Sequence, residues 1–74
     1  MVNLRKRSLT LAGHSTSLAL EPEFWAVLEA MAEAEDRSLA ALVADLDKTR
    51  SARPLASACR LAALEWTRRA NGST

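Results

Sequence analysis

The sequence predicts a small, mainly α-helical domain with one β-strand near its N-terminus. Length is the first reason, because 74 residues support one hydrophobic core, and we expect residues 1–74 to form a single domain. Hydropathy is the second, because apolar residues alternate before residue 21 and recur every three or four residues after it. Segment boundaries are the third: prolines and capping residues divide the region after residue 21 into three helical segments.

The predicted strand covers residues 14–20. Side chains alternate between the two faces of a strand. One face is therefore apolar, with Leu18 and Leu20, and the other carries three small residues, Ser15, Ser17 and Ala19.

Residues 1–13 form either a basic arm or a short strand. Leu9 and Leu11 alternate with polar residues, as a strand requires. The sequence leaves open whether they pair with residues 14–20 through a turn at Gly13 or extend as an arm.

The first predicted helix covers residues 22–35. Proline is tolerated in a first helical turn, and acidic residues there complement the helix dipole, so Glu21-Pro22-Glu23 indicates its start. Its apolar side chains follow helical spacing: Phe24, Val27, Leu28, Met31 and Ala32.

Two further helices are predicted over residues 38–49 and 55–70. Ser38 is the expected N-cap of the second helix, whose apolar residues are Leu39, Leu42, Val43 and Leu46. Pro54 precedes the third helix and Asn71-Gly72 follows it. Its apolar stripe consists of Leu55, Ala58, Cys59, Ala62 and Trp66.

Composition excludes several classes of protein. No run of about 18 apolar residues exists, so we expect no membrane span, and the first seven residues lack the apolar stretch of a secretory signal. The chain is therefore expected in the cytoplasm. Cys59 is the single cysteine and His14 the single histidine, so we expect no disulfide, metal or cofactor. Without a glycine-rich loop or a clustered nucleophile and base, the sequence predicts no enzyme.

A single strand needs a partner, because its backbone donors and acceptors are otherwise unpaired. Within the chain the candidate is the segment Ser8–Leu11. Between chains it is the same strand of a second copy, paired antiparallel across a two-fold axis. A chain of this size has a small core and no covalent or metal crosslink, which favours a homodimer.

Several stretches resemble the ribbon-helix-helix DNA-binding family. They are Thr16 to Trp25, Leu28 with Met31 and Ala32, and Arg37 to Val43. The stretch Lys6 to His14 and the additional C-terminal helix are similar to a subgroup of short bacterial members. The resemblance implies an intermolecular two-stranded antiparallel ribbon in a dimer, with four helices packed beneath it and a third C-terminal helix in each chain.

The resemblance also implies three groups of DNA-binding residues. The strand face with Ser15, Ser17 and Ala19 would enter the major groove. The start of the second helix, at Ser38, Leu39 and Ala40, would hold a phosphate. The basic residues would follow the phosphate backbone: Arg5, Lys6 and Arg7.

Each of these groups has a structural alternative. The strand face can be solvated or covered by the N-terminal arm, and Ser38 can cap its helix without DNA. The expected dimer core is Leu18, Leu20, Phe24, Leu28, Met31, Leu42, Val43 and Leu46. Trp25 is expected to cover the dimer seam or the third helix.

Two functions follow from these observations. The first is a homodimeric DNA-binding transcriptional regulator, a repressor or autoregulator, that inserts a β-ribbon into the major groove of double-stranded DNA. The alternative is a dimeric protein-interaction module, antitoxin-like or an adaptor, that has lost sequence-specific DNA recognition. Its protein partner would bind the C-terminal helix; no membrane partner is expected.

Overall fold

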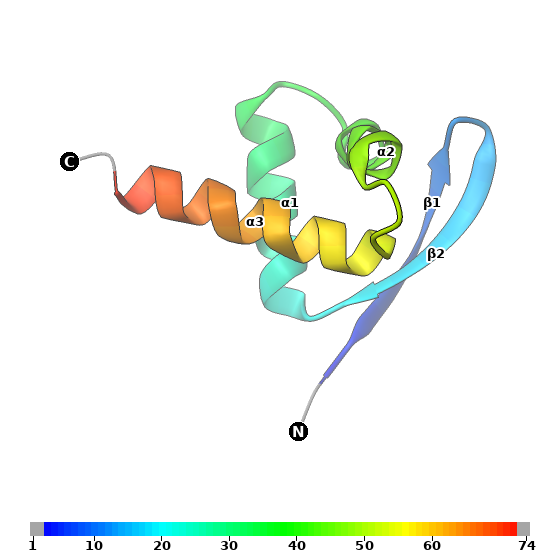
Figure 1. Ribbon diagram of the computed structural model, residues 1–74, viewed down its shortest axis with the longest axis horizontal. Helices are drawn as coiled ribbons and strands as arrows, with labels where there is room; N and C mark the ends of the chain where they lie inside the picture. The colour runs from blue at the N-terminus through cyan, green and yellow to red at the C-terminus, as the bar shows by residue number, and fades with distance from the viewer. Residues whose placement is uncertain (1–2, 73–74) are drawn as a thin grey trace.

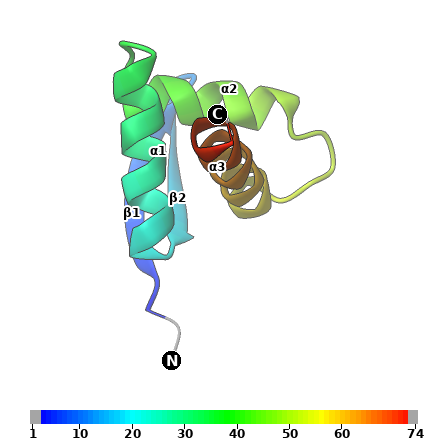
Figure 2. The ribbon, with the colours of Figure 1, turned by 90° about the vertical axis from the view of Figure 1, so that its left-hand side faces the viewer.

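The computed structural model describes residues 3–72 as a β-hairpin followed by three helices. The strands are β1 (Arg5–Leu11) and β2 (His14–Leu20). The helices are α1 (Pro22–Ala34), α2 (Leu39–Thr49) and α3 (Leu55–Asn71). All three helices lie on one side of the hairpin, which leaves its other face uncovered (Figures 1 and 2). Residues 1, 2, 73 and 74, at the ends of the predicted domain, lie outside the described part of the chain.

The hairpin corrects the expectation of one strand. β1 pairs antiparallel with β2 of the same chain, in a register that runs from Arg5 opposite Leu20 to Leu11 opposite His14. Residues 5–11 are therefore a strand rather than an arm, and the pairing that the sequence left open is made within the chain. Pairing of β2 with a second copy stays a prediction.

The turn explains how the hairpin closes. Ala12 and Gly13 form a two-residue connection in which both residues have positive φ, 52° and 84°. Two positive φ values are typical of the type I′ turn, whose twist matches that of the flanking strands. Glycine adopts this conformation without strain, whereas alanine does so less readily.

The junction between α1 and α2 is a tight, hydrogen-bonded turn. Asp36 has a φ of 55°. Its N–H donates to the Glu33 carbonyl, and the Arg37 N–H donates to the Ala32 carbonyl, each at 3.0 Å. This pair of bonds is a Schellman motif, which satisfies carbonyls at the end of α1 and redirects the chain toward α2.

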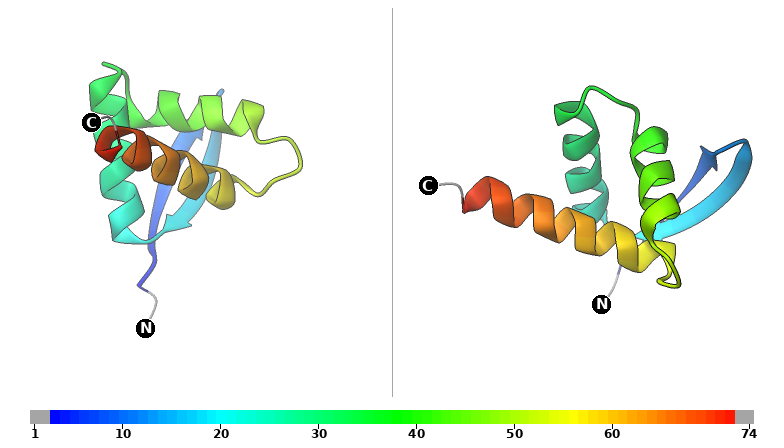
Figure 3. Two further views of the ribbon diagram at one scale, coloured as in Figure 1. Left: turned by 60° about the vertical axis from the view of Figure 1, so that its left-hand side comes forward. Right: turned by 45° about the horizontal axis from the view of Figure 1, so that its top comes forward.

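The core is formed between the inner face of the hairpin and the three helices (Figure 3). Its fully buried side chains come from every layer: Leu20, Leu28, Val43 and Cys59. Six of the eight residues predicted for a dimer core are buried within this single chain: Leu18, Leu20, Leu28, Met31, Leu42 and Val43. Phe24 and Leu46 are partly buried against them.

Trp25 occupies a different place from the one predicted. It is 2% exposed and lies against β1, where its Nε1–H donates to the Arg5 carbonyl at 2.8 Å. Phe24, one residue earlier, is only partly buried and lies beneath the Arg60 guanidinium. The reason is geometric: adjacent residues point about 100° apart on a helix, and β1, which the sequence left open, supplies the surface that covers Trp25.

Within residues 3–72, no helix is long and apolar enough to cross a membrane.

Candidate functional site

The outer face of the hairpin carries six side chains that point away from the helices. The register places them in three opposed pairs, Lys6 with Ala19, Ser8 with Ser17, and Thr10 with Ser15. Opposed residues of an antiparallel pair share one face of the sheet. Five of the six are exposed and Ala19 is partly buried. We call this surface the outer face.

The outer face is rich in hydroxyl groups. Ser8, Thr10, Ser15 and Ser17 form a two-by-two array, with Lys6 toward the open end of the hairpin. A hydroxyl donates and accepts hydrogen bonds, so it can contact base edges or phosphates. Ser8 and Thr10 are not among the predicted site residues, because the sequence leaves the strand character of β1 open. The alternation Lys6-Arg7-Ser8-Leu9-Thr10-Leu11 is the signal that identifies them.

Arg5 and Arg7 alternate to the opposite side of β1 from Lys6. Arg7 lies over the Trp25 ring, with Cζ 4.7 Å from the ring centroid. Its Nη1–H donates to Glu29 Oε2 at 2.8 Å. Of the three predicted basic contacts, only Lys6 therefore belongs to the outer face.

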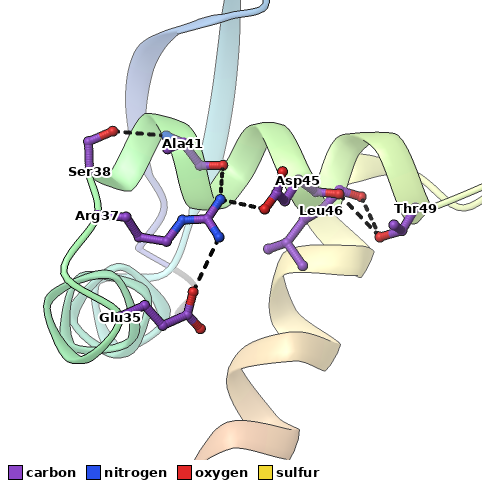
Figure 4. Close-up of polar contacts among 7 residues, drawn as sticks. All are labelled: Glu35, Arg37, Ser38, Ala41, Asp45, Leu46 and Thr49. Carbon is purple, nitrogen blue, oxygen red and sulfur yellow. Dashed lines mark hydrogen bonds and ion pairs between the residues drawn. The ribbon is translucent and has the colours of Figure 1, made fainter.

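The N-terminus of α2 is capped as the sequence predicts. Ser38 Oγ accepts a hydrogen bond from the Ala41 N–H at 3.0 Å (Figure 4). Leu39 and Ala40 provide the first two amides of the helix, and their side chains are partly buried. The capping bond occupies the third amide and leaves the first two as potential phosphate donors.

The surroundings of this helix end are acidic. A surface hollow beside Ser38 and Leu39 is lined by three carboxylate residues, Glu29, Glu33 and Asp36. Arg37 also lines it, but its guanidinium donates to the Asp45 carboxylate, the Ala41 carbonyl and Glu35 Oε1 (Figure 4). The hydrogen bond from Arg37 and its positive charge hold the pKa of Asp45 below its usual range. The cation at this helix end is thus engaged within the chain.

A second arginine ties α3 to the junction between β2 and α1. Arg60 Nε–H donates to Glu21 Oε1 at 3.0 Å, and the guanidinium carbon lies 5.9 Å from the centre of the Phe24 ring. This hydrogen bond lowers the pKa of Glu21. The contact joins the helical layer to the residue that directly follows the hairpin.

Two observations concern metal ligands and the single cysteine. Residues 3–72 contain no cluster of three or more potential metal ligands. Burial raises the pKa of the Cys59 thiol to about 11. Cys59 is therefore protonated at neutral pH and packs as a small apolar side chain.

Comparison with protein families matched a family model. It is described as a ribbon-helix-helix domain and covers residues 4–67, from the residue before β1 to most of α3. No curated protein matched the chain, and no solved structure did.

Proposed function

Because the chain belongs to the ribbon-helix-helix family, whose members are generally DNA-binding transcription regulators, we propose that it is a homodimeric regulator that inserts its hairpin into the major groove. The regulation proposed is that of a repressor or autoregulator. A DNA target is consistent with the cytoplasmic location that the sequence predicts. Family members are typically not enzymes, which supports a binding role over a catalytic one.

The outer face carries this proposal. The major groove is about 12 Å wide, and two paired strands about 4.8 Å apart fit within it with their side chains toward the bases. Four hydroxyl groups and Lys6 then meet base edges and phosphates. A hydroxyl can bind a donor or an acceptor on a base edge, so we expect each contact to discriminate only modestly between base pairs.

A homodimer doubles this face. The sheet has two strands, so β2 has one edge with no strand beside it in the described chain. That edge belongs to the strand with Ser15, Ser17 and Ala19, whose small side chains allow a second copy to approach. Antiparallel pairing across a two-fold axis would join two hairpins into a four-stranded sheet, in which the two β2 strands form the central ribbon that enters the groove and the β1 strands flank it. Most of the predicted dimer core is already buried within one chain. The second copy would therefore add hydrogen bonds between the two β2 strands rather than complete the hydrophobic core.

Selection from a random duplex pool at about 150 mM salt tests the proposal, because weak nonspecific contacts are largely screened there. We expect a two-fold related sequence to be enriched by a protein whose mass in solution is that of a dimer. Retention without enrichment would contradict sequence-specific regulation. A monomeric mass would contradict the dimer.

A second candidate function is supported by one observation on α3. Leu61 and Leu64 are 45% and 51% exposed, and residues three apart share a face of a helix. This apolar pair suits a protein partner, as in the interaction-module hypothesis. Replacing both leucines with glutamate should then abolish co-purification of a stoichiometric partner while leaving DNA binding unchanged. Loss of DNA binding in that variant would count against a separate partner surface.

A further inference from the structure

A hollow lies between β1 and the N-terminal half of α1. It measures about 290 Å³ and is lined by Arg5, Lys6, Arg7, Pro22, Trp25, Ala26 and Glu29. Three cationic residues and one carboxylate give its lining a net positive charge. A water molecule takes about 30 Å³ of liquid volume, so the hollow has room for a phosphodiester group.

Arg7 is held in place at the wall of this hollow. Its guanidinium lies on the face of Trp25, and that ring is fixed by burial and by its bond to the Arg5 carbonyl. The ion pair with Glu29 uses one nitrogen, Nη1. Guanidinium has five N–H donors, so several stay available for an incoming anion.

The ion pair between Arg7 and Glu29 is replaceable. The side chains are 40% and 54% exposed, and exposed pairs contribute little to stability because water screens them. Arginine binds phosphate through parallel hydrogen bonds, which the single contact to Glu29 does not match. A phosphate can therefore displace the Glu29 carboxylate from the Arg7 guanidinium.

The position suits DNA on the outer face. A two-stranded ribbon is narrower than the major groove, so the phosphates that form the groove walls lie beside its edges. The α2 N-terminus, the phosphate contact that the family resemblance implies, is surrounded by Glu29, Glu33 and Asp36. Glu29 lines both hollows, but the hollow beside β1 has three cationic residues and one carboxylate, whereas the hollow beside α2 has one arginine and three carboxylates, so the first attracts a phosphate more strongly.

We propose that this hollow is a DNA phosphate-binding site in which Glu29 is the internal counter-ion of Arg7. Binding exchanges the Arg7–Glu29 pair for an Arg7–phosphate pair, with Arg5 alongside. Glu29 consequently lowers affinity for DNA and limits nonspecific retention. The inference rests on the proposed DNA-binding function and adds the residues that set its strength.

The test measures affinity for a 20-base-pair mixed-sequence duplex over about 50 to 300 mM salt. Variants Glu29→Gln and Arg7→Gln probe the site. Glu33→Gln is the matched control, because Glu33 is an exposed carboxylate on the same helix with no ion pair at its side chain in the described structure. Equilibrium unfolding shows that each variant is folded.

We expect Glu29→Gln to bind about two- to tenfold more tightly than wild type at low salt, because both subunits of a dimer lose the competing carboxylate. Glu33→Gln should change affinity less. Arg7→Gln should weaken binding and reduce the salt slope by about 0.9 for each lost phosphate contact. The gain from Glu29→Gln should disappear in the Arg7→Gln background, because the two residues act as a pair.

Two outcomes overturn the phosphate site alone. One is an equal gain from Glu29→Gln and Glu33→Gln, and the other is a Glu29→Gln gain that persists without Arg7. In both, DNA binding through the outer face would stand. Wild-type protein that binds no DNA at about 50 mM salt would instead contradict the proposed function, and the phosphate site with it.

Discussion

The outer face of the hairpin and the N-terminus of α2 are two of the three regions where the family resemblance predicts DNA contacts, and the structure gives them opposite surroundings. The outer face has exposed hydroxyls and Lys6, with no carboxylate among its six residues. The α2 N-terminus lies beside Glu29, Glu33 and Asp36, and Arg37 there is bound to Asp45. Ser38 serves its own helix.

This difference separates a surface that is free to bind from one that stabilises the fold. In the family resemblance, the amides at the start of the second helix bind a phosphate. Here one of those amides already donates to Ser38, and carboxylates line the adjacent hollow. The hairpin, in contrast, uses its inner face for packing, and the side chains of its outer face make no hydrogen bond or ion pair with the described residues 3–72. We therefore expect changes at α2 to alter stability and changes at the hairpin to alter DNA binding.

Trp25→Ala should give the largest loss of stability, because it removes the side chain that joins α1 to β1. Deleting a buried aromatic residue costs about 3 to 5 kcal/mol of unfolding free energy. Urea denaturation measures this loss. Trp25→Phe keeps most of the packing and loses the hydrogen bond to Arg5, so it should cost much less; equal losses would show that packing does not dominate.

The turn residues test the intrachain hairpin. Gly13→Ala should destabilise the protein by about 1 to 2 kcal/mol, because Gly13 has a φ of 84°. Ala12→Asn should stabilise it by up to about 1 kcal/mol, because asparagine followed by glycine favours the type I′ turn. Thermal unfolding measures both. No effect from either substitution would contradict the turn and support an extended arm.

Ser38→Ala should separate the cap from DNA binding. Loss of the bond to the Ala41 amide should cost about 1 kcal/mol of stability. The salt slope of DNA binding should stay that of wild type, since the hydroxyl already serves Ala41. Ser38→Gly, which costs only a few tenths of a kcal/mol, is the control. A reduced salt slope in Ser38→Ala would place a phosphate at this helix end.

The smallest expected effect is on the stability of the protein at acidic pH. Arg60 lowers the folded-state pKa of Glu21 from 4.5, so the unfolded chain binds more protons at mildly acidic pH. The stabilisation from this pair is therefore present above pH 4.5 and is lost as pH falls through the folded pKa. Glu21→Gln should flatten the decline in stability below pH 4.5. An unchanged acid profile would show that the pair contributes nothing measurable.

The sequence predicts the helical half of the fold well. Leu28, Met31, Leu42 and Val43 follow helical spacing, and the structure buries all four. The Ser38 cap was also predictable, because a serine before an apolar helical run satisfies an amide locally.

The hairpin was less predictable, and so were its contacts. The turn begins with Ala12 instead of the asparagine or aspartate that marks a type I′ turn, which weakens the local signal. Because the sequence left β1 open, it did not predict that β1 buries Trp25 or that Ser8 and Thr10 lie on the outer face. The Arg7–Glu29 pair joins residues 22 positions apart, so no local pattern indicates it.

DNA binding by a variant with a charge at the centre of the outer face tests the central claim most directly. Ser17→Glu places a carboxylate opposite Ser8, and Ala52→Glu places the same charge in the exposed loop between α2 and α3, which projects away from the hairpin in Figure 2. We predict that Ser17→Glu weakens DNA binding at least about tenfold through repulsion of the phosphates. Ala52→Glu should have a much smaller effect, with both variants folded. Equal binding by the two variants would contradict the assignment of the outer face as the DNA-binding surface.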